Sequence, residues 1–485
     1  MLEKDRLADL FREFLAPDSI LTDEEDLRPY ECDALSACRK LPWMVVLPER
    51  IDQIQRLMKI CSQHRIPVVG RGAGTGLSGG ALPLEKGVVL GLAKLNRILE
   101  IDPVNRVARV QPGVQNLAIS RAVAPYGLYY APDPSSQIAC TIGGNVAENS
   151  GGVHCLKYGL TVHNIRQLDV ITVEGTIVRL GSTGLDAPGY DLMALLCGSE
   201  GMLGIIVEIT VKLLPIPETA QVLMASFSSV QAAGDAVASI IGAGIVPAGL
   251  EMMDNPAIRA AEDFVRVGYP VEAQALLLCE SDGNRDQVAE EIDKMRAILK
   301  QSGAEDIREA RNATERQQLW AGRKAAFPAV GRIAPDYYCM DGTIPRRRLS
   351  EVLEGISELA RHYRLGVANV FHAGDGNLHP LILYNANHPG ELERAERFGS
   401  DILELCVAVG GTITGEHGVG VEKINQMCFQ FNDAELAQFH AVKKAFDQHS
   451  LLNPGKAVPT LQRCAEFGAM HVHRGKQAFP ELERF

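Results

Sequence analysis

Apolar residues recur along the chain with two different periods, and the places where the period changes mark the elements that we expect. The run WMVVLP at residues 43–48 is a short apolar stretch that ends at a proline, which predicts a buried strand. Residues 51–64 then carry apolar side chains at intervals of three and four, which predicts an amphipathic helix. A further apolar run begins at Ile66 and leads into a glycine-rich stretch, so we expect a strand to end there.

That glycine-rich stretch, GRGAGTGLSGG at residues 70–80, contains the spacing G-x-G-x-x-G between Gly74 and Gly79. In dinucleotide-binding Rossmann folds these glycines open a helix. Here Pro83 follows closely and the strand-like run VVLGL begins at Val88, which leaves no room for a helix. We therefore reject a Rossmann site. We expect instead a loop whose backbone N–H groups wrap a pyrophosphate, the alternative being a long flexible turn.

Two more stretches rich in small residues lie between strand-like segments. They are APDPSSQIACTIGGNVAENSGGVHCLKYG at residues 131–159 and GSEGMLGI at residues 198–205. Any one of these loops could also occur in a globular protein without a ligand. Because three such loops are separated by strands, they favour one extended ligand that crosses an α+β domain.

The chain is long enough for more than one hydrophobic core. Its 485 residues exceed the roughly 250–300 residues at which a single core stops growing. The sequence PIPE at residues 215–218 has the composition of a linker, and beyond it strand-like runs such as VLMASF alternate with long helical patterns. We therefore expect two or three domains.

Composition and charge narrow the class of protein. A hydrophobic content of 46% and a charged content of 22% are typical of a globular protein in water. The net charge of −12 argues against nucleic acid as the main ligand. The N-terminal stretch MLEKDRLADLFREFL fits neither a signal peptide nor an arginine-rich transit peptide. We expect a soluble, cytoplasmic protein, and any peripheral association with the inner membrane would have to come through partner subunits.

The eleven cysteines are scattered, and no C-x-x-C pair occurs among them. Neither an iron–sulfur run nor a structural zinc site is therefore indicated, and most of the thiols should be reduced and packed. If the protein carries out a redox reaction, its electrons must leave through a relay on another molecule.

The segment FHAGDGNLHP at residues 371–380 holds two histidines around a Gly-Asp-Gly-Asn turn. A two-residue turn at Asp375 and Gly376 would place His372 directly opposite His379 on paired strands. Directly opposed Cβ atoms lie about 4.5–5.5 Å apart, close enough for both rings to bind one divalent cation. The alternative is a pair of surface or packed histidines beside an ordinary hairpin.

A second polar motif, TGEHGVG at residues 414–420, contains Glu416 and His417 between glycines. A carboxylate completes a set of two histidines and one acid that leaves coordination positions open for a substrate. A neighbouring imidazole, with a reference pKa near 6.5, suits a general base close to neutral pH. The alternative is a glycine-rich loop with solvated polar tips.

The order of these motifs resembles that of a known family, the vanillyl-alcohol-oxidase type of FAD-dependent 2-hydroxy-acid dehydrogenases. The resemblance rests on GRGAGTGLSGG, PDPSSQIACTIGGNVAENSGG, GSEGMLGI, HAGDGNLHP, GEHGVG and LLNPGK, and it extends from about Arg28 to the last residue. Within the family, the arginine region LWAGRKAAF and the tail after Cys464 most resemble the flavin-binding subunits of bacterial glycolate-oxidising complexes.

The resemblance implies an α+β fold with three parts. A PCMH-type FAD-binding domain would cover residues 1–219, and an antiparallel α+β cap domain with the metal site would cover residues 220–413. A C-terminal segment at 414–485 would complete the active site, return to the FAD domain and end in a tail that docks a partner.

The resemblance also implies noncovalent FAD, because the first loop has no histidine or cysteine of the type that tethers flavin. The implied FAD-binding residues are Arg71, Gly72, Ala73, Gly74, Thr75, Gly76, Ser78, Gly79, Pro132, Asp133, Ser136, Gly143, Gly144, Gly152 and Ile206.

In the family, residues matching His372, His379 and Glu416 hold a divalent metal ion, here expected to be zinc with manganese or iron as alternatives. The ion chelates the hydroxyl and carboxylate oxygens of the substrate and lowers the pKa of the hydroxyl. The resemblance makes His417 the base that removes the hydroxyl proton while hydride passes to the flavin, giving a 2-keto acid.

The resemblance makes Arg323 the residue that binds the substrate carboxylate, since a guanidinium pairs with carboxylates through two hydrogen bonds. An isolated arginine on a helix would more often be solvated, and Lys324 beside it is expected to face solvent. Cys339 occupies the position of a lysine in relatives that oxidise larger dicarboxylic hydroxy acids. The loss of that cation implies a small substrate, glycolate first and lactate as the alternative.

Three functions follow as hypotheses. The first is a glycolate-oxidising flavin subunit that passes electrons to an iron–sulfur subunit, in a complex with a second FAD-family subunit. The second is a self-sufficient D-lactate dehydrogenase that produces pyruvate. The third is a non-enzymatic scaffold that binds FAD or a metal ion only for assembly, against which the Glu416–His417 pair argues.

Other polar features have less specific explanations. The run PRRRL at residues 345–349 is either a solvated cluster or a charge at the substrate entrance. His154 and His163 flank the second glycine-rich stretch, and either contact flavin or pack. His471 and His473 near Cys464 are more compatible with a docking tail than with a second metal site.

Overall fold

The computed structural model describes residues 2–184 and 189–459, and these divide into two compact units. The first unit comprises the described residues of 2–150, 160–216 and 417–459. The second comprises 151–159 and 217–416. The division expected from the sequence kept 151–159 with the FAD domain and began the C-terminal segment at 414. The features at Cys464, His471 and His473, and the partner-docking tail, lie outside the described residues.

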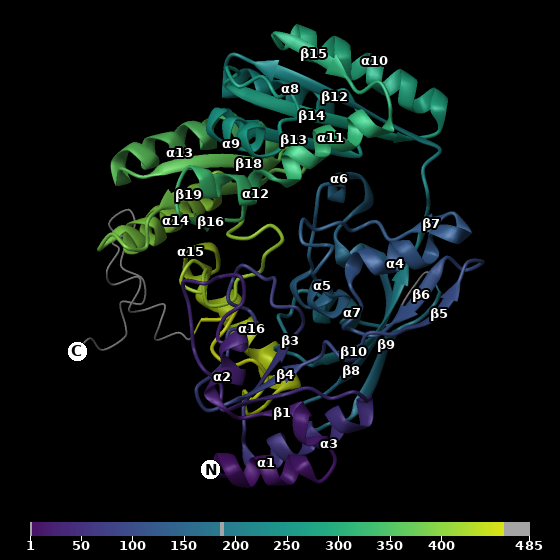
Figure 1. Cartoon of the computed structure of the whole chain (residues 1–485), viewed down its shortest axis with the longest axis vertical. Coiled ribbons are helices and arrows are strands. Elements are labelled where there is room, and N and C mark those ends of the chain that lie inside the picture. Colours follow the sequence, from purple (N-terminus) through teal and green to yellow (C-terminus); the bar gives the residue numbers. More distant parts are fainter. Residues whose placement is uncertain (1, 185–188, 460–485) are drawn as a thin grey trace. The chain divides into compact units, whose positions relative to one another are not determined.

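One sheet of the first unit has four strands in the order β1–β2–β4–β3, with β2 and β3 both parallel to β4 (Figure 1). The strands are β1 (Ile20–Leu21), β2 (Met44–Val46), β3 (Val68–Arg71) and β4 (Val88–Gly91). Helices α1 (Lys4–Arg12) and α3 (Ile51–His64) bury their apolar faces in the same core as these strands. The strand and helix expected at 43–48 and 51–64 are therefore confirmed.

The other large sheet of the first unit is antiparallel, in the order β5–β6–β10–β8–β9. Its strands are β5 (Ile98–Asp102), β6 (Val107–Val110), β8 (Ile165–Ile171), β9 (Ile177–Gly181) and β10 (Ile205–Lys212). Its core includes residues of α4 (Asn116–Val123), α5 (Ile142–Glu148) and α7 (Leu192–Leu196). A short antiparallel pair, β7 (Leu128–Tyr129) and β11 (Leu214–Pro215), also belongs to this unit.

The C-terminal part of the first unit returns to the four-stranded sheet, as expected. It carries α15 (Met427–Gln430) and α16 (Asp433–Phe446), and beyond them Val68 of β3 pairs with Leu452. The buried carboxylate of Glu200 accepts hydrogen bonds of 2.7 Å from the backbone N–H groups of both Val419 and Gly420. Segments more than 200 residues apart are therefore joined by hydrogen bonds in the interior.

Lys456 is a buried cation in the segment that follows α16. Its Nζ donates hydrogen bonds to Gly80 O at 2.9 Å, Leu82 O at 2.5 Å and Asn453 Oδ1 at 2.6 Å. Burial is the main cause that lowers the pKa of Lys456 to about 7. Buried acceptors left without a donor cost about 1–3 kcal/mol each.

We expect Lys456→Met to lower the free energy of unfolding by about 2–4 kcal/mol, because it leaves these acceptors without a donor. Urea denaturation at pH 6, where the ammonium is protonated, checks this expectation. Lys444→Met, at an exposed position of α16, is the matched control. Equal midpoints for the two variants would contradict the assignment.

The second unit is built on a fully antiparallel eight-stranded sheet in the order β15–β12–β14–β13–β18–β19–β16, with β17 also paired to β19. The strands are β12 (Thr219–Phe227), β13 (Gly249–Asp254), β14 (Ala275–Gly283), β15 (Asp306–Glu309), β16 (Asp336–Cys339), β17 (Gly342–Thr343), β18 (Gly366–His372) and β19 (Asn377–Tyr384). This antiparallel α+β sheet is the one expected for the cap.

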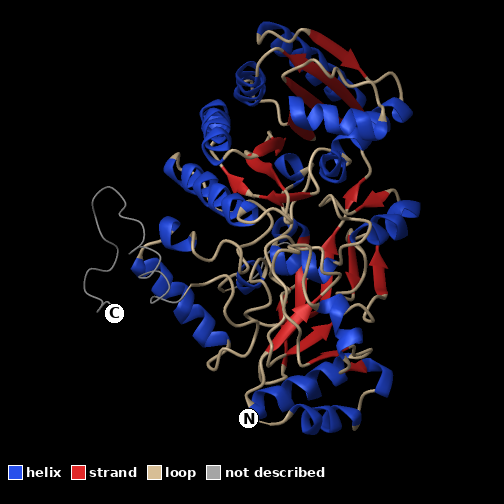
Figure 2. Ribbon diagram, turned by 60° about the vertical axis from the view of Figure 1, so that its left-hand side comes forward, coloured by secondary structure: helices blue, strands red, loops and turns tan. Residues whose placement is uncertain are grey.

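Helices cover both faces of this sheet (Figure 2). One face packs against α8 (Val230–Gly242), α10 (Arg285–Gln301), α13 (Leu349–Tyr363) and α14 (Glu391–Ala408). The other packs against α9 (Asn255–Val265), α11 (Ala313–Lys324) and α12 (Ala326–Ala329). Because both faces are covered, central strands such as β13 are buried along their whole length. Among the described residues, no helix is long and apolar enough to cross a bilayer.

The segment 151–159 joins the second unit through its polar side chains. Lys157 Nζ lies 2.6 Å from Asp282 Oδ1, and the Tyr158 hydroxyl donates to the same carboxylate at 2.7 Å. His154 Nε2 lies 3.3 Å from Glu280 Oε1 on the same strand, β14. Both carboxylates are buried, so these contacts neutralise charges inside the second unit.

Candidate active site

The two histidines of HAGDGNLH lie on neighbouring strands, but their register differs from the expectation. His372 pairs with Asn377, and His379 pairs with Val370. The prediction that the histidines are directly opposed is therefore wrong by two residues. The turn spans residues 373–376. The expected two-residue turn requires a positive φ at both Asp375 and Gly376, but of these two only Gly376 has one, of 86°.

A shift of two residues keeps both side chains on the same face of the sheet, since side chains alternate with a period of two. The ring centroids of His372 and His379 lie 5.0 Å apart. Their Nε2 atoms approach one oxygen, Glu416 Oε1, at 3.2 Å and 3.0 Å respectively. The structure thus brings together His372, His379 and Glu416, with ligand atoms within 4.8 Å of one another.

The electrostatics of this group are set by its mutual contacts. Burial alone would raise the pKa of Glu416, but the hydrogen bonds and charges of His372 and His379 hold it well below its ordinary value. Burial alone would lower the pKa of His372, but Glu251 and Glu416 raise it well above its ordinary value. The group therefore brings opposite charges together in a buried place, and a cation that binds the two imidazole nitrogens would replace a proton of His372.

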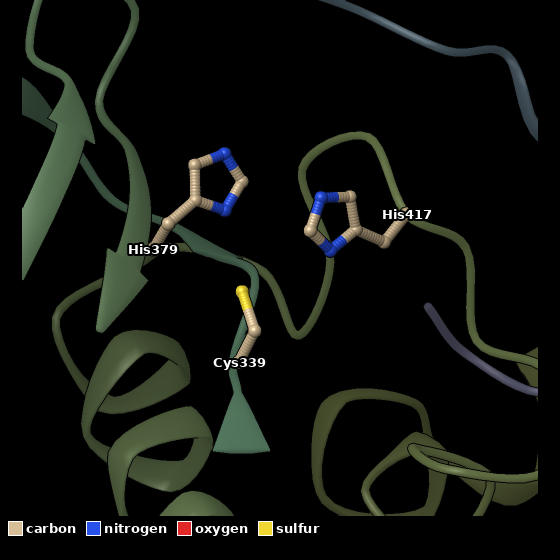
Figure 3. A group of neighbouring side chains, drawn as sticks. All are labelled: Cys339, His379 and His417. Atoms are coloured by element: carbon tan, nitrogen blue, oxygen red, sulfur yellow. The ribbon is translucent and has the colours of Figure 1, made fainter. Parts of the chain in front are cut away.

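The donor set fits a divalent metal ion. Two imidazole nitrogens and one carboxylate oxygen converge from different elements, and such a set leaves positions open for further ligands. Cys339 Sγ also lies within 4.8 Å of a ring nitrogen of His379. Figure 3 shows the sulfur of Cys339 and the ring of His379, and it labels His417 on the loop after Glu416. The Cys339 thiol donates a hydrogen bond of 3.4 Å to Met340 O.

Sequence reasoning missed Glu251, a carboxylate buried behind His372. Glu251 lies on β13 directly across from His372, and its Oε1 is 2.8 Å from His372 Nδ1. Its other oxygen, Oε2, lies 2.6 Å from Nη2 of Arg323. The signal that could have found it was an acid, Glu251, flanked on both sides by apolar residues in the strand GLEMMD.

Asp341, which sequence reasoning also missed, holds the loop that carries Glu416. Its buried carboxylate accepts from Thr414 Oγ1 at 2.6 Å, from Gly415 N at 3.0 Å and from Glu416 N at 3.2 Å. These bonds fix the backbone at Glu416. The residue lies in the irregular segment between β16 and β17, and nothing local in its sequence marks this function.

Asn377 is the third residue that was missed, although it lies inside the histidine motif. It is buried in the same row of the sheet as Glu251 and His372. Its Oδ1 has no hydrogen-bond partner in the described part of the chain. Gly415 allows this arrangement, because a Cβ at that position would collide with the Asn377 carboxamide.

Arg323 lies near the C-terminal end of α11 and is 2% exposed, so it is not a solvated helix charge. Its Nε has no hydrogen-bond acceptor among residues 2–184 and 189–459. Lys324 is exposed, as expected. In the run PRRRL, Arg347 and Arg348 are exposed, whereas Arg346 donates to Gly374 O at 3.1 Å and so supports the histidine turn.

The glycine-rich loop at residues 72–80 lies in the first unit between β3 and β4, and residues 72–87 contain turns and bends but no helix. The rejection of a Rossmann site is therefore confirmed. Gly72 packs against Thr141 so closely that a Cβ there would collide with its side chain. A Cβ at Gly143 would lie 2.6 Å from the Pro112 ring. Two of the implied FAD-binding stretches thus meet with little side-chain bulk between them.

The side chains of this region fit a polar cofactor. Ser78 Oγ and Thr141 Oγ1 are buried and have no hydrogen-bond partner in the described residues. A polar ligand would satisfy them, since buried hydroxyls are rarely left without a partner. The other implied residues in the first unit are Arg71, Ala73, Gly74, Thr75, Gly76, Gly79, Pro132, Asp133, Ser136, Gly144 and Ile206. Gly152 belongs to the second unit.

The two histidines that flank the second glycine-rich stretch have protein partners. His154 contacts Glu280, and its ring centroid lies 6.1 Å from that of Trp320. His163 Nδ1 accepts a hydrogen bond of 3.1 Å from Leu160 N. Both contacts agree with a packing role.

Comparison with known proteins identifies related sequences and folds. Residues 42–181 match the family model "FAD binding domain", and residues 216–457 match "FAD linked oxidases, C-terminal domain". Glycolate oxidase subunit GlcD of Escherichia coli strain K12 is 65% identical over 98% of this chain and 95% of its own. A D-lactate dehydrogenase of Anaerostipes hadrus is 32% identical over 91% of this chain and 95% of its own.

A solved structure shows the same fold at low identity. The 4-ethylphenol oxidase from Gulosibacter chungangensis superposes with a TM-score of 0.79 at 18% identity. The match covers 94% of this chain and 98% of that enzyme. The expected PCMH-type α+β fold is therefore confirmed.

Proposed function

This chain belongs to the FAD-linked oxidases and is an FAD-linked oxidoreductase, and from that premise we propose that it oxidises glycolate to glyoxylate at a divalent metal site. The single observation that supports a metal-assisted reaction best is the approach of two imidazole Nε2 atoms to one oxygen of Glu416. The high identity to a glycolate oxidase subunit supports the substrate class.

In this proposal, His372, His379 and Glu416 hold the cation, and His417 accepts the hydroxyl proton at a ring nitrogen. When bound, the cation supplies a Lewis acid for the substrate hydroxyl, and noncovalent FAD supplies the hydride acceptor. Arg323 attracts the substrate carboxylate through the guanidinium N–H groups that Glu251 leaves unused. The burial of Arg323 supports this role, because electrostatic attraction is stronger away from water.

The small thiol of Cys339 near His379 supports a small substrate with a single carboxylate. Without a cation at that position, a second carboxylate would be buried unpaired, which is costly. Glycolate and D-lactate both satisfy this condition. We assign glycolate as the preferred substrate, with D-lactate as the second candidate because a D-lactate dehydrogenase is also among the relatives.

The electrons are proposed to pass to an iron–sulfur subunit of a multi-subunit complex. Two observations support this. The E. coli relative is named a subunit, and the sequence of this chain contains no C-x-x-C motif for a cluster of its own. A second FAD-family subunit, and peripheral attachment to the inner membrane through the partners, belong to the same proposal.

The proposal is tested by anaerobic mixing of the purified, FAD-containing protein with glycolate, D-lactate and L-lactate while flavin absorbance is followed. We expect rapid bleaching by glycolate, slower bleaching by D-lactate and none by L-lactate. A yellow protein that none of these acids bleaches would contradict the proposed reaction. A colourless protein that does not take up FAD would favour the scaffold hypothesis.

Removal of the metal should slow flavin reduction by at least 100-fold, because the substrate hydroxyl would lose its Lewis acid. The measurement compares reduction rates before and after dialysis against a chelator, and after zinc is added back. A chelator saturated with zinc beforehand is the control. An unchanged rate in a protein shown to be metal-free would remove the cation from the mechanism.

A further inference from the structure

The inference rests on the proposed metal site and adds a residue to it. We propose that Glu251 is a positioning residue that turns His372 so that its Nε2 lone pair faces the cation. Glu251 itself touches neither the proposed cation nor the substrate in this scheme. It acts through the ring of His372.

The first step of the argument is the contact between Glu251 and His372. The two residues are directly opposed on β13 and β18, and Oε1 lies 2.8 Å from Nδ1. A carboxylate only accepts hydrogen bonds, so the ring must carry its proton on Nδ1. When a cation takes the place of the proton on Nε2, the neutral ring presents the Nε2 lone pair on the side where Nε2 approaches Glu416.

The second step concerns what holds Glu251. Its Oε2 lies 2.6 Å from Arg323 Nη2, and both side chains are almost completely buried. The contact is an ion pair without hydrogen-bond geometry, and the fixed positive charge of the guanidinium keeps the carboxylate oxygen Oε2 facing it. One oxygen of the Glu251 carboxylate therefore faces a guanidinium, and the other accepts from an imidazole N–H. Loss of either contact would leave a buried polar group unpaired.

The third step is that glutamine cannot replace this carboxylate. A carboxamide has one acceptor and one donor end. If its oxygen faces the charged Arg323, its NH₂ group faces His372 Nδ1, which then must accept. The ring proton would move to Nε2 and block the position that binds the cation. Glu251→Gln therefore keeps the shape of the side chain but favours the wrong tautomer.

The experiment is a titration of the metal-free, full-length protein with Zn²⁺ in competition with a chromophoric chelator. We expect Glu251→Gln and Glu251→Asp each to weaken zinc binding about 10–100-fold, the usual effect of removing such an outer hydrogen bond. The matched control is Glu280→Gln. Glu280 is also buried and lies on the neighbouring strand β14, but its carboxylate is paired with Arg316 at 3.0 Å, with His154 and with the Trp320 indole.

The outcomes are distinguishable. If wild-type protein binds no zinc, the proposed function fails at its metal site, and this inference fails with it. If wild-type protein binds zinc and Glu251→Gln binds it equally well, only this inference is overturned. A purely structural role would lower the urea midpoint of Glu251→Gln and Glu280→Gln alike and leave zinc affinity unchanged. If Glu251→Gln does not fold, Glu251→Asp decides by the same titration.

Discussion

Replacing His379 with alanine is expected to reduce the rate of flavin reduction by glycolate by at least 1000-fold and to remove the bound metal. His379 supplies one of the two ring nitrogens that approach Glu416 Oε1, at 3.0 Å. Without it, only one histidine and one carboxylate remain, which is too few for a stable site of this class. The cation would be lost, and with it the Lewis acid for the substrate hydroxyl.

Two measurements check the His379 prediction: metal content per protein by elemental analysis, and the anaerobic rate of flavin reduction by stopped flow. The matched control is His388→Ala, since the side chain of His388 is 63% exposed and lies in the turn after β19. The control should retain both metal and rate. A His379→Ala protein that keeps its metal would show that the ligand set is wrongly assigned.

Replacing His417 with alanine should slow flavin reduction by about 10²–10⁴-fold, the usual contribution of a positioned general base. In contrast to His379→Ala, this variant should keep its metal, because His417 is not one of the three ligands. The two variants therefore separate metal binding from proton transfer.

Added imidazole provides the control for His417. A free base that enters the space left by the ring should restore part of the rate in His417→Ala and leave wild-type protein unchanged. A wild-type rate in His417→Ala would remove this residue as the base. Loss of metal in this variant would instead indicate that His417 is itself a ligand.

The histidine pair illustrates how far the sequence could predict the site. The motif contained both rings and the turn residues, and it predicted correctly that the rings share a face. It did not predict the register, because the Asp375 side chain accepts from Asn377 N at 3.0 Å and stabilises a longer turn. An error of two residues keeps the face, whereas an error of one would have separated the rings.

The contacts of Glu251 and Asp341 were not predictable for a different reason. Each acid contacts residues far away in the chain: Glu251 meets His372 across paired strands, and Asp341 meets Glu416 through a loop. Such contacts depend on strand order, which local patterns do not specify. The rejection of the Rossmann site succeeded because it depended only on Pro83 and the strand beginning at Val88, both local features.

The division into units has a consequence for how this protein can be cut and recombined. The polypeptide passes between the two units at 150/151, 159/160, 216/217 and 416/417, so neither is encoded by one uninterrupted stretch. A recombinant fragment of 217–416 would lack Lys157 and leave the acidic Asp282 without its cation. Exchange of this unit between related genes would therefore need a second, separate transfer of nine codons, for residues 151–159. Domain shuffling by a single crossover pair would combine the 151–159 segment of one parent with the partner of Lys157, Asp282, from the other.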